Sequence, residues 1–162
     1  MAKKKHDPSI ANSIIAMKPK KNIALIAHDH RKLDLLDWAF YNRDSLAEHN
    51  LFGTGTTGSL AAKKLDLPVY TFKSGPLGGD IQIGSAIIEN EIDIMIFFWD
   101  PLQAQPHDVD VKALLRISVV YNIPLACNRS SADFIISSKL LDEPYNRFIV
   151  DYSQRFKTDI DF

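Results

Sequence analysis

Two glycine-rich runs place chemically useful side chains beside flexible backbone. The run GPLGGD (residues 75–80) ends in a single acid, Asp80, and paired glycines are poor material for the interior of a strand or helix. Such a run suits a loop whose N–H groups approach a small ligand and present one carboxylate to it. A second run, GTGTTG (residues 53–58), combines glycines with threonine hydroxyls. Together the runs predict a pocket that holds a phosphate with one loop and performs proton chemistry with the other.

The threonine-rich run is a candidate phosphate loop. It leads into a predicted helix, so the free N–H groups at the start of that helix and the hydroxyls would converge on an anion. The residues concerned are Thr54, Gly55, Thr56 and Thr57. The alternative is a tight turn in which a threonine caps the helix. No Lys follows the last glycine and the spacing is not G-x-G-x-x-G, so a small phosphorylated metabolite is favoured over a nucleotide.

Two histidines and a lysine accompany these runs. His28 and His107 follow different predicted strands, where an imidazole can polarise a carbonyl or protonate a leaving group. Capping or packing is the alternative for each histidine. Lys32 lies one helical turn beyond His28 and can supply a point charge for phosphate, with a solvated surface lysine as the alternative.

The acids other than Asp80 favour supporting roles. Asp29 and Asp108 could each cap the helix that follows. Asp100 stands before a proline and could hold a loop or a histidine rather than react. His107, Asp108 and Asp110 resemble a hard-metal cluster, but no second ligand group has convincing spacing. No metal site is therefore expected.

Apolar periodicity indicates the elements that position these residues. Short β-branched runs alternate with amphipathic segments from residue 22 to 137, which predicts a parallel sheet with helices on both faces. We expect one three-layer α/β/α domain, an open Rossmann-like sheet of about five mainly parallel strands. Residues 147–152 could add an edge strand. The expected strands are residues 22–27, 51–53, 69–71, 93–99 and 123–127, and the expected helices are residues 32–48, 57–64, 80–91, 109–121 and 131–137.

The inner side of the first helix is expected to carry Leu33, Leu36, Trp38 and Phe40. In open parallel sheets, ligands bind outside the carboxyl ends of the strands. Most of the distinctive polar residues follow directly after an expected strand. The sequence therefore predicts that they meet at one edge of the sheet.

Composition limits the classes of partner. The net charge of the 162 residues is −1, but residues 1–21 contain six Lys and one Asp, so the remainder is acidic. An acidic body argues against a nucleic-acid-binding face. No signal peptide and no membrane-spanning apolar segment is visible, and the single cysteine, Cys127, excludes an intrachain disulfide and is interpreted as packing. A cytoplasmic protein is expected, with a basic disordered leader at residues 1–21, a domain at residues 22–155 and a tail at residues 156–162.

Six motifs in the same order resemble those of the methylglyoxal synthase family and cover about residues 22–137. They are AHD (residues 27–29) with Lys32, TGTTG (54–58), SGP (74–76), GGD (78–80), FFWDP (97–101) and PHDVDVKAL (106–114). The lysine-rich leader and the C-terminal segment depart from the family's pattern.

The resemblance implies a carbon–oxygen lyase that converts dihydroxyacetone phosphate to methylglyoxal and inorganic phosphate without a metal or an organic cofactor. It also implies a homohexamer that inorganic phosphate inhibits cooperatively. By this resemblance Asp80 is the base, and Asp29, Asp100 and Asp110 support the site, with Asp29 and Asp110 counted among the catalytic residues. The implied phosphate and substrate contacts are His28, Lys32, Thr54, Gly55, Thr56, Thr57, Ser74, Gly75 and His107.

This chemistry agrees with the residues themselves. Asp80 would take a proton from the carbon next to the carbonyl, and His28 and His107 would stabilise the resulting enediolate. The alternative is a non-catalytic effector-binding domain, similar to the regulatory domain of large carbamoyl-phosphate synthetases. Such a sensor needs the threonine-rich loop but has no use for Asp80 together with His107. A nucleotide-binding oxidoreductase is disfavoured because the glycine fingerprint and the ribose-binding acid are missing.

Overall fold

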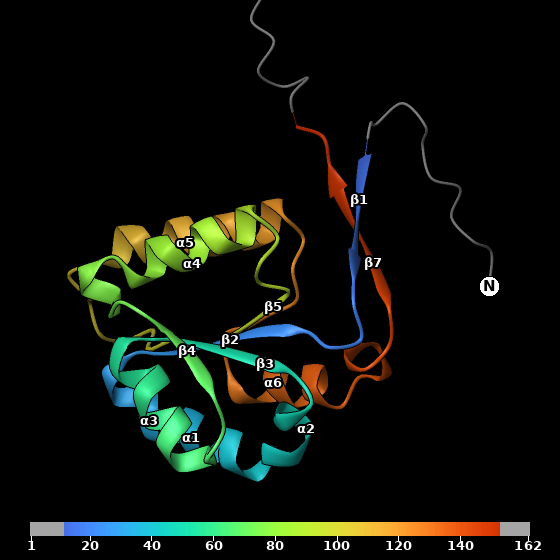
Figure 1. Cartoon of the computed structure of the whole chain (residues 1–162). Helices are drawn as coiled ribbons and strands as arrows, with labels where there is room; N and C mark the ends of the chain where they lie inside the picture. The colour runs from blue at the N-terminus through green and yellow to red at the C-terminus, as the bar shows by residue number, and fades with distance from the viewer. Residues whose placement is uncertain (1–11, 153–162) are drawn as a thin grey trace, which may run out of the picture.

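A computed structural model describes residues 12–152 and builds them around a parallel five-stranded sheet with the strand order β4-β3-β2-β5-β6 (Figure 1). Two neighbouring strands inside the sheet, β2 and β5, are the most apolar, because both of their faces are covered. The strands are β2 (Asn22–Ala27), β3 (Asn50–Thr54), β4 (Val69–Phe72), β5 (Ile94–Phe98) and β6 (Leu125–Ala126).

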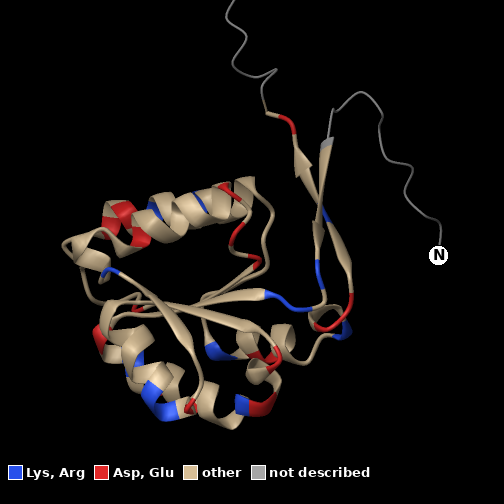
Figure 2. Cartoon of the chain, viewed as in Figure 1, with Lys and Arg blue, Asp and Glu red and all other residues tan. Residues whose placement is uncertain are grey.

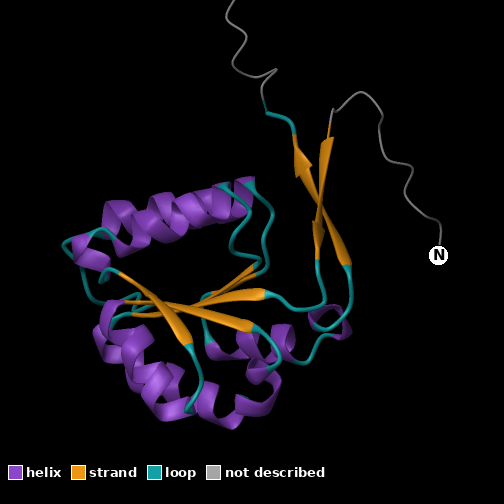
Figure 3. Cartoon of the chain, viewed as in Figure 1, coloured by secondary structure: helices purple, strands orange, loops and turns teal. Residues whose placement is uncertain are grey.

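Helices cover both faces of this sheet, as Figures 1 and 3 show. One face carries α1 (Lys32–Tyr41), α2 (Arg43–Ala47), α3 (Gly55–Leu65) and α6 (Arg129–Ile136), and the other carries α4 (Gly79–Ile88) and α5 (Asp108–Val120). Each face has its own apolar core, one around Trp38 and the other around Phe97. The expected three-layer α/β/α fold is confirmed. Short 3-10 helices, η1 (Asp29–Arg31), η2 (Gly75–Leu77) and η3 (Lys139–Leu141), complete the connections.

The first expected helix is two helices, which corrects the prediction for residues 32–48. The side-chain amide of Asn42 and its backbone N–H both donate to the Trp38 carbonyl, and α1 ends there. The prediction that Leu33 and Phe40 face inward is also wrong, because these side chains are 75% and 56% exposed. The buried face of α1 consists of Leu35, Leu36, Trp38 and Ala39. These residues follow the spacing of one helical stripe, whereas Leu33 and Phe40 lie off it.

The C-terminal strand β7 (Tyr145–Val150) pairs antiparallel with β1 (Asn12–Met17) and not with the main sheet. The edge-strand prediction for residues 147–152 is therefore wrong. These two strands form a separate ribbon that projects beside the helical layers in Figures 1 and 3. Residues 12–17 lie in the expected disordered leader, so that prediction is wrong for β1. The rest of the leader and the tail, residues 1–11 and 153–162, lie outside the described residues.

Two buried cations hold this ribbon to the body. The Lys21 ammonium is fully buried and donates to the carbonyls of Lys18 and Glu143, so it is not part of a solvated tail. The Arg147 guanidinium is also fully buried and donates to the Tyr121 carbonyl at the end of α5. Carbonyl oxygens accept hydrogen bonds from both cations, and Arg147 also donates to the side chain of Asn90, as buried charged groups require partners.

Candidate active site

A cavity of about 210 Å³ opens at the carboxyl edge of the sheet. It lies where the strand order changes direction between β2 and β5, the usual ligand position in such sheets. The His28 N–H donates to the Phe98 carbonyl over 3.2 Å and joins the ends of these two strands. The lining residues come from the segments after four strands, as expected from the sequence. They are Ile26, Ala27, His28, Asp29, Lys32, Thr54, Thr56, Thr57, Ser74, Gly75, Pro76, Asp80, Gln105 and His107.

His28 presents an N–H group to this cavity. Burial lowers its pKa, and the neighbouring His107 lowers it further, so the imidazole is neutral near pH 7. Its Nδ1 accepts a hydrogen bond from the Asp100 backbone N–H over 3.1 Å, which assigns the remaining proton to Nε2. The Nε2 atom is buried and has no hydrogen-bond partner within the described part of the chain. It is therefore a free donor for a ligand oxygen.

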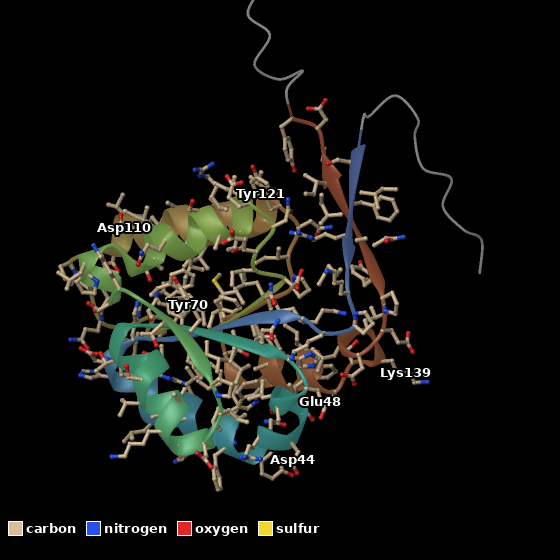
Figure 4. The ribbon with its side chains drawn as sticks, in the orientation of Figure 1. Asp44, Glu48, Tyr70, Asp110, Tyr121 and Lys139 are labelled. Carbon is tan, nitrogen blue, oxygen red and sulfur yellow. The ribbon has the colours of Figure 1, made fainter. Side chains whose placement is uncertain are left out.

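Asp80 and His107 form a buried acid–imidazole pair. The Asp80 Oδ2 atom lies 3.4 Å from His107 Nε2, and the two side chains are 3% and 9% exposed. Burial raises the pKa of Asp80, the charge of Asp110 raises it further, and His107 opposes this effect. A carboxylate with a raised pKa is a better proton acceptor than an ordinary one. Asp110 lies in the first turn of α5, and Figure 4 labels it at the end of this helix away from the ribbon.

Two glycines allow this pair to form. A Cβ atom at Gly75 would lie 2.8 Å from His107 Nε2, so a side chain there would displace the imidazole. A Cβ atom at Gly79 would lie 1.9 Å from the Lys73 carbonyl oxygen, which leaves no room for any other residue. The glycine-rich run therefore lets its backbone lie close to the His107 side chain. The run also begins α4 at Gly79, so that Asp80 lines the cavity.

The threonine-rich run forms another part of the cavity wall. Helix α3 begins at Gly55, earlier than expected, with Thr54 as its extended N-cap residue. The N–H groups of its first turn have no acceptor within the helix, so they are available to an anion. Thr56 and Thr57 line the cavity, and the Thr56 hydroxyl accepts from Lys32 Nζ over 3.3 Å. Lys32 also donates to Asp29 Oδ1 over 2.5 Å, and this hydrogen bond lowers the pKa of Asp29.

Three of the expected site residues lie behind the cavity wall. Gly55 is not a lining residue; it packs against Ser74, with a Cβ position only 2.7 Å from the Ser74 Cα. Asp100 holds His28 through its backbone, and its Oδ1 accepts from the Leu102 N–H. Asp110 acts on Asp80 through its charge. Asp100 thus holds both a histidine and a loop, as its position before a proline suggested.

Gln105 and Pro76 line the cavity although the sequence did not single them out as site residues. Gln105 stands two residues before His107, and this proximity was the available signal.

Within residues 12–152, no group of three or more His, Cys, Asp or Glu side chains is arranged to hold a metal ion. Cys127 is half-buried and burial raises the pKa of its thiol, which fits packing better than nucleophilic chemistry.

Figure 2 shows acidic residues in the first turn of α5, where Asp108 and Asp110 lie. The cavity is thus lined by the cation Lys32, by the start of α3 and by the acid Asp80, and the acids of α5 lie behind its wall. No helix of the described chain is both long and apolar enough to cross a membrane.

The fold and the cavity define an α/β protein with a small polar ligand site at the switch point of a parallel sheet. A family model described as MGS-like domain matches residues 34–127. The chain is 58% identical over 139 residues to methylglyoxal synthase of Leptospira interrogans, covering 86% of this chain and 94% of that protein. It is 55% identical over 143 residues to methylglyoxal synthase of Clostridium acetobutylicum, covering 88% and 99% of the two.

A crystal structure of methylglyoxal synthase from Elizabethkingia anophelis has a TM-score of 0.85 to this fold at 50% identity, covering 92% of this chain and 98% of that one. The chain therefore belongs to the methylglyoxal synthase family, as its motifs indicated.

Proposed function

We propose that this protein converts dihydroxyacetone phosphate to methylglyoxal and inorganic phosphate. The observation that carries the proposal is the buried Asp80–His107 pair, which lines the same cavity of about 210 Å³ as Lys32 and the threonines at the start of α3. The relatives named methylglyoxal synthase support the same reaction. A purely effector-binding module would use the anion site but not the acid–imidazole pair.

The reaction would begin with proton transfer. Asp80 accepts a proton from the carbon next to the carbonyl. The electrons of that C–H bond form a C=C double bond, and the π electrons of the carbonyl move to its oxygen, which gives an enediolate. The neutral His28 Nε2–H and the His107 imidazole donate to the oxygens on which charge develops. The raised pKa of Asp80 brings it closer to the pKa of the C–H group that loses the proton.

Elimination of phosphate would follow at the other wall. The C–O bond to phosphate breaks as the enediolate electrons form a new double bond, and the released enol gives methylglyoxal. Lys32, the threonine hydroxyls and the α3 N–H groups stabilise the departing phosphate. Asp29 holds the Lys32 ammonium against this wall. In this proposal Thr54, Gly55 and Ser74 shape the phosphate loop, and no metal or cofactor takes part.

We also propose, from the family resemblance, a homohexamer that is cytoplasmic and is inhibited by inorganic phosphate. An assembly would bury some of the apolar side chains that one copy exposes, among them Tyr41, Val109 and Phe134, which are 85%, 80% and 81% exposed. Light scattering should give six times the monomer mass, and a monomeric mass would contradict this proposal.

The reaction is tested by incubating the purified protein with dihydroxyacetone phosphate and measuring dicarbonyl and inorganic phosphate together. Equal release of both products is expected. Asp80→Asn should lower kcat by about 100-fold or more, the usual effect of losing a general base, while phosphate binding persists. Asp37→Asn is a matched control, because Asp37 is an exposed acid paired with Lys64 outside the cavity. Absence of equal product release would disprove the assignment.

A further inference from the structure

Gln105 differs from the residues that precede it in the loop after β5. Residues 101–104 are exposed, whereas Gln105 is half-buried and lines the cavity together with Asp80 and His107. Its neighbour on the same loop, Gln103, has the same side chain but does not line the cavity. The structure thus separates two chemically identical residues by position alone.

Asp108 holds the backbone of Gln105 on both sides. The Gln105 N–H donates to Asp108 Oδ2 over 3.1 Å, and the Asp108 N–H donates to the Gln105 carbonyl over 3.2 Å. This reciprocal pair closes a turn immediately before α5, so Gln105 keeps a defined place beside His107. Asp108 therefore supports the loop, which differs from the expected role of a helix N-cap; the N-cap residue is His107.

The chemistry of this wall favours a neutral amide. A triose carries a hydroxyl and a carbonyl, and a carboxamide can donate to one and accept from the other. A charged side chain in the same place would change the pKa of Asp80, which burial and Asp110 already raise. Gln105 lies two residues before His107 and lines the cavity together with it, whereas Lys32 and the start of α3 supply the groups that would bind phosphate.

We propose that the side-chain amide of Gln105 contacts the triose end of the substrate, and that Asp108 is the positioning residue that holds it there. The proposal rests on the proposed function, because it names the part of the substrate that this wall recognises. By this proposal, Gln105 distinguishes a triose phosphate from inorganic phosphate.

Binding in an inactive background tests this without relying on turnover. In the Asp80→Asn protein, calorimetry would measure the affinity for dihydroxyacetone phosphate and for inorganic phosphate. Adding Gln105→Leu should weaken binding of the triose phosphate about tenfold, the usual effect of removing a buried polar partner, and leave inorganic phosphate binding unchanged. Adding Gln103→Leu should change neither affinity. Equal effects of the two leucine variants, or equal losses for both ligands, would overturn the proposal.

Kinetics in the active protein test the role of Asp108. Gln105→Leu and Asp108→Ala should each lower kcat/KM by about tenfold, and the double variant should be little worse than either single variant because both remove one contact. Gln105→Glu should move the acid limb of the kcat/KM profile to higher pH, because a new negative charge beside Asp80 raises its pKa. Additive losses of kcat/KM in the double variant would show that Asp108 does not act through Gln105. A wild-type protein without turnover would instead disprove the proposed function, and the binding experiment would still decide about Gln105.

Discussion

At the scale of single residues, the site depends on polar atoms that are buried without a partner. Asp80 Oδ2, His28 Nε2 and His107 Nδ1 belong to residues that line one cavity. None of these atoms has a hydrogen-bond partner among the described residues, although Asp80 Oδ2 lies 3.4 Å from His107 Nε2. Leaving buried polar atoms unpaired costs stability, so their concentration in one place indicates a ligand that pairs with them. The acid among them depends on its neighbours, because Asp110 raises and His107 lowers its pKa.

Asp110→Asn should move the acid limb of the kcat/KM profile to lower pH. Asp80 must be ionised to accept a proton, so activity falls as the pH decreases through its pKa. Removing the like charge of Asp110 lowers that pKa, and the ionised form then persists to lower pH. A profile of kcat/KM against pH checks the sign, with Asp44→Asn as the control because Asp44 is fully exposed. A limb that moves upward would contradict the assignment of Asp80 as the base.

At the scale of elements, α4 positions the base through its first turn. The helix starts at Gly79, directly before Asp80, and Gly78 precedes it in a left-handed conformation with φ of 95°. The Gly79 N–H donates to the Ser74 carbonyl over 2.9 Å and closes the loop that lines the cavity. The same helix contains a second glycine, Gly84, which has ample space around it.

The two glycines of α4 should respond oppositely to alanine. Gly79→Ala would place a methyl group 1.9 Å from the Lys73 carbonyl oxygen, so the loop must move and kcat should fall by about 100-fold. Gly84→Ala meets only Leu114 Cδ1 at 3.9 Å and should stabilise the protein by about 0.5–1 kcal/mol through helix propensity. Steady-state kinetics and urea unfolding measure both effects. Full activity in Gly79→Ala would show that the loop tolerates the displacement.

At the scale of the whole molecule, two adjacent helices connect the site to the ribbon. Helices α4 and α5 begin beside Asp80 and His107 and end near Arg147 of β7. The Arg147 guanidinium donates to the Tyr121 carbonyl over 2.6 Å and to Asn90 Oδ1 over 3.1 Å. Figure 4 shows Asp110 at one end of α5 and Tyr121 at the other, toward the ribbon. A cation at these C-terminal ends also complements the helix dipoles.

Arg147→Met should destabilise the protein by about 3–5 kcal/mol, the typical result of removing one partner from a buried charged network. The change leaves the Tyr121 carbonyl and the Asn90 side chain unpaired, and it removes the positive charge that lowers the pKa of Asp93. Urea unfolding monitored by circular dichroism measures the loss. Arg129→Met, at an exposed arginine, serves as the control. Equal stability of the two variants would show that Arg147 does not anchor the ribbon.

Much of the fold and part of the site could be predicted from local patterns. Strand and helix alternation is visible in apolar periodicity, and it led to the correct layers and to the edge where the cavity lies. Most of the wrong predictions concern features that depend on contacts with segments remote in the sequence. The exposure of Leu33 depends on which stripe of α1 meets the core, whereas the split at Asn42 comes from a local contact with the Trp38 carbonyl four residues earlier. The pairing of β7 with β1 joins the two ends of the described chain.

By itself, the sequence determined the residue types at the end of each strand and the glycines that let backbone approach them, because periodicity and glycine content are local properties. Only the tertiary structure decided what each residue does there. The proton of His28 is placed on Nε2 by a backbone N–H that lies 72 residues away, at Asp100. Asp110 acts through its charge and Gln105 lines the cavity, because α5 packs beside α4 and brings these residues toward Asp80. Hydrogen bonds, burial and charge act through space, so the identity of a side chain does not determine them.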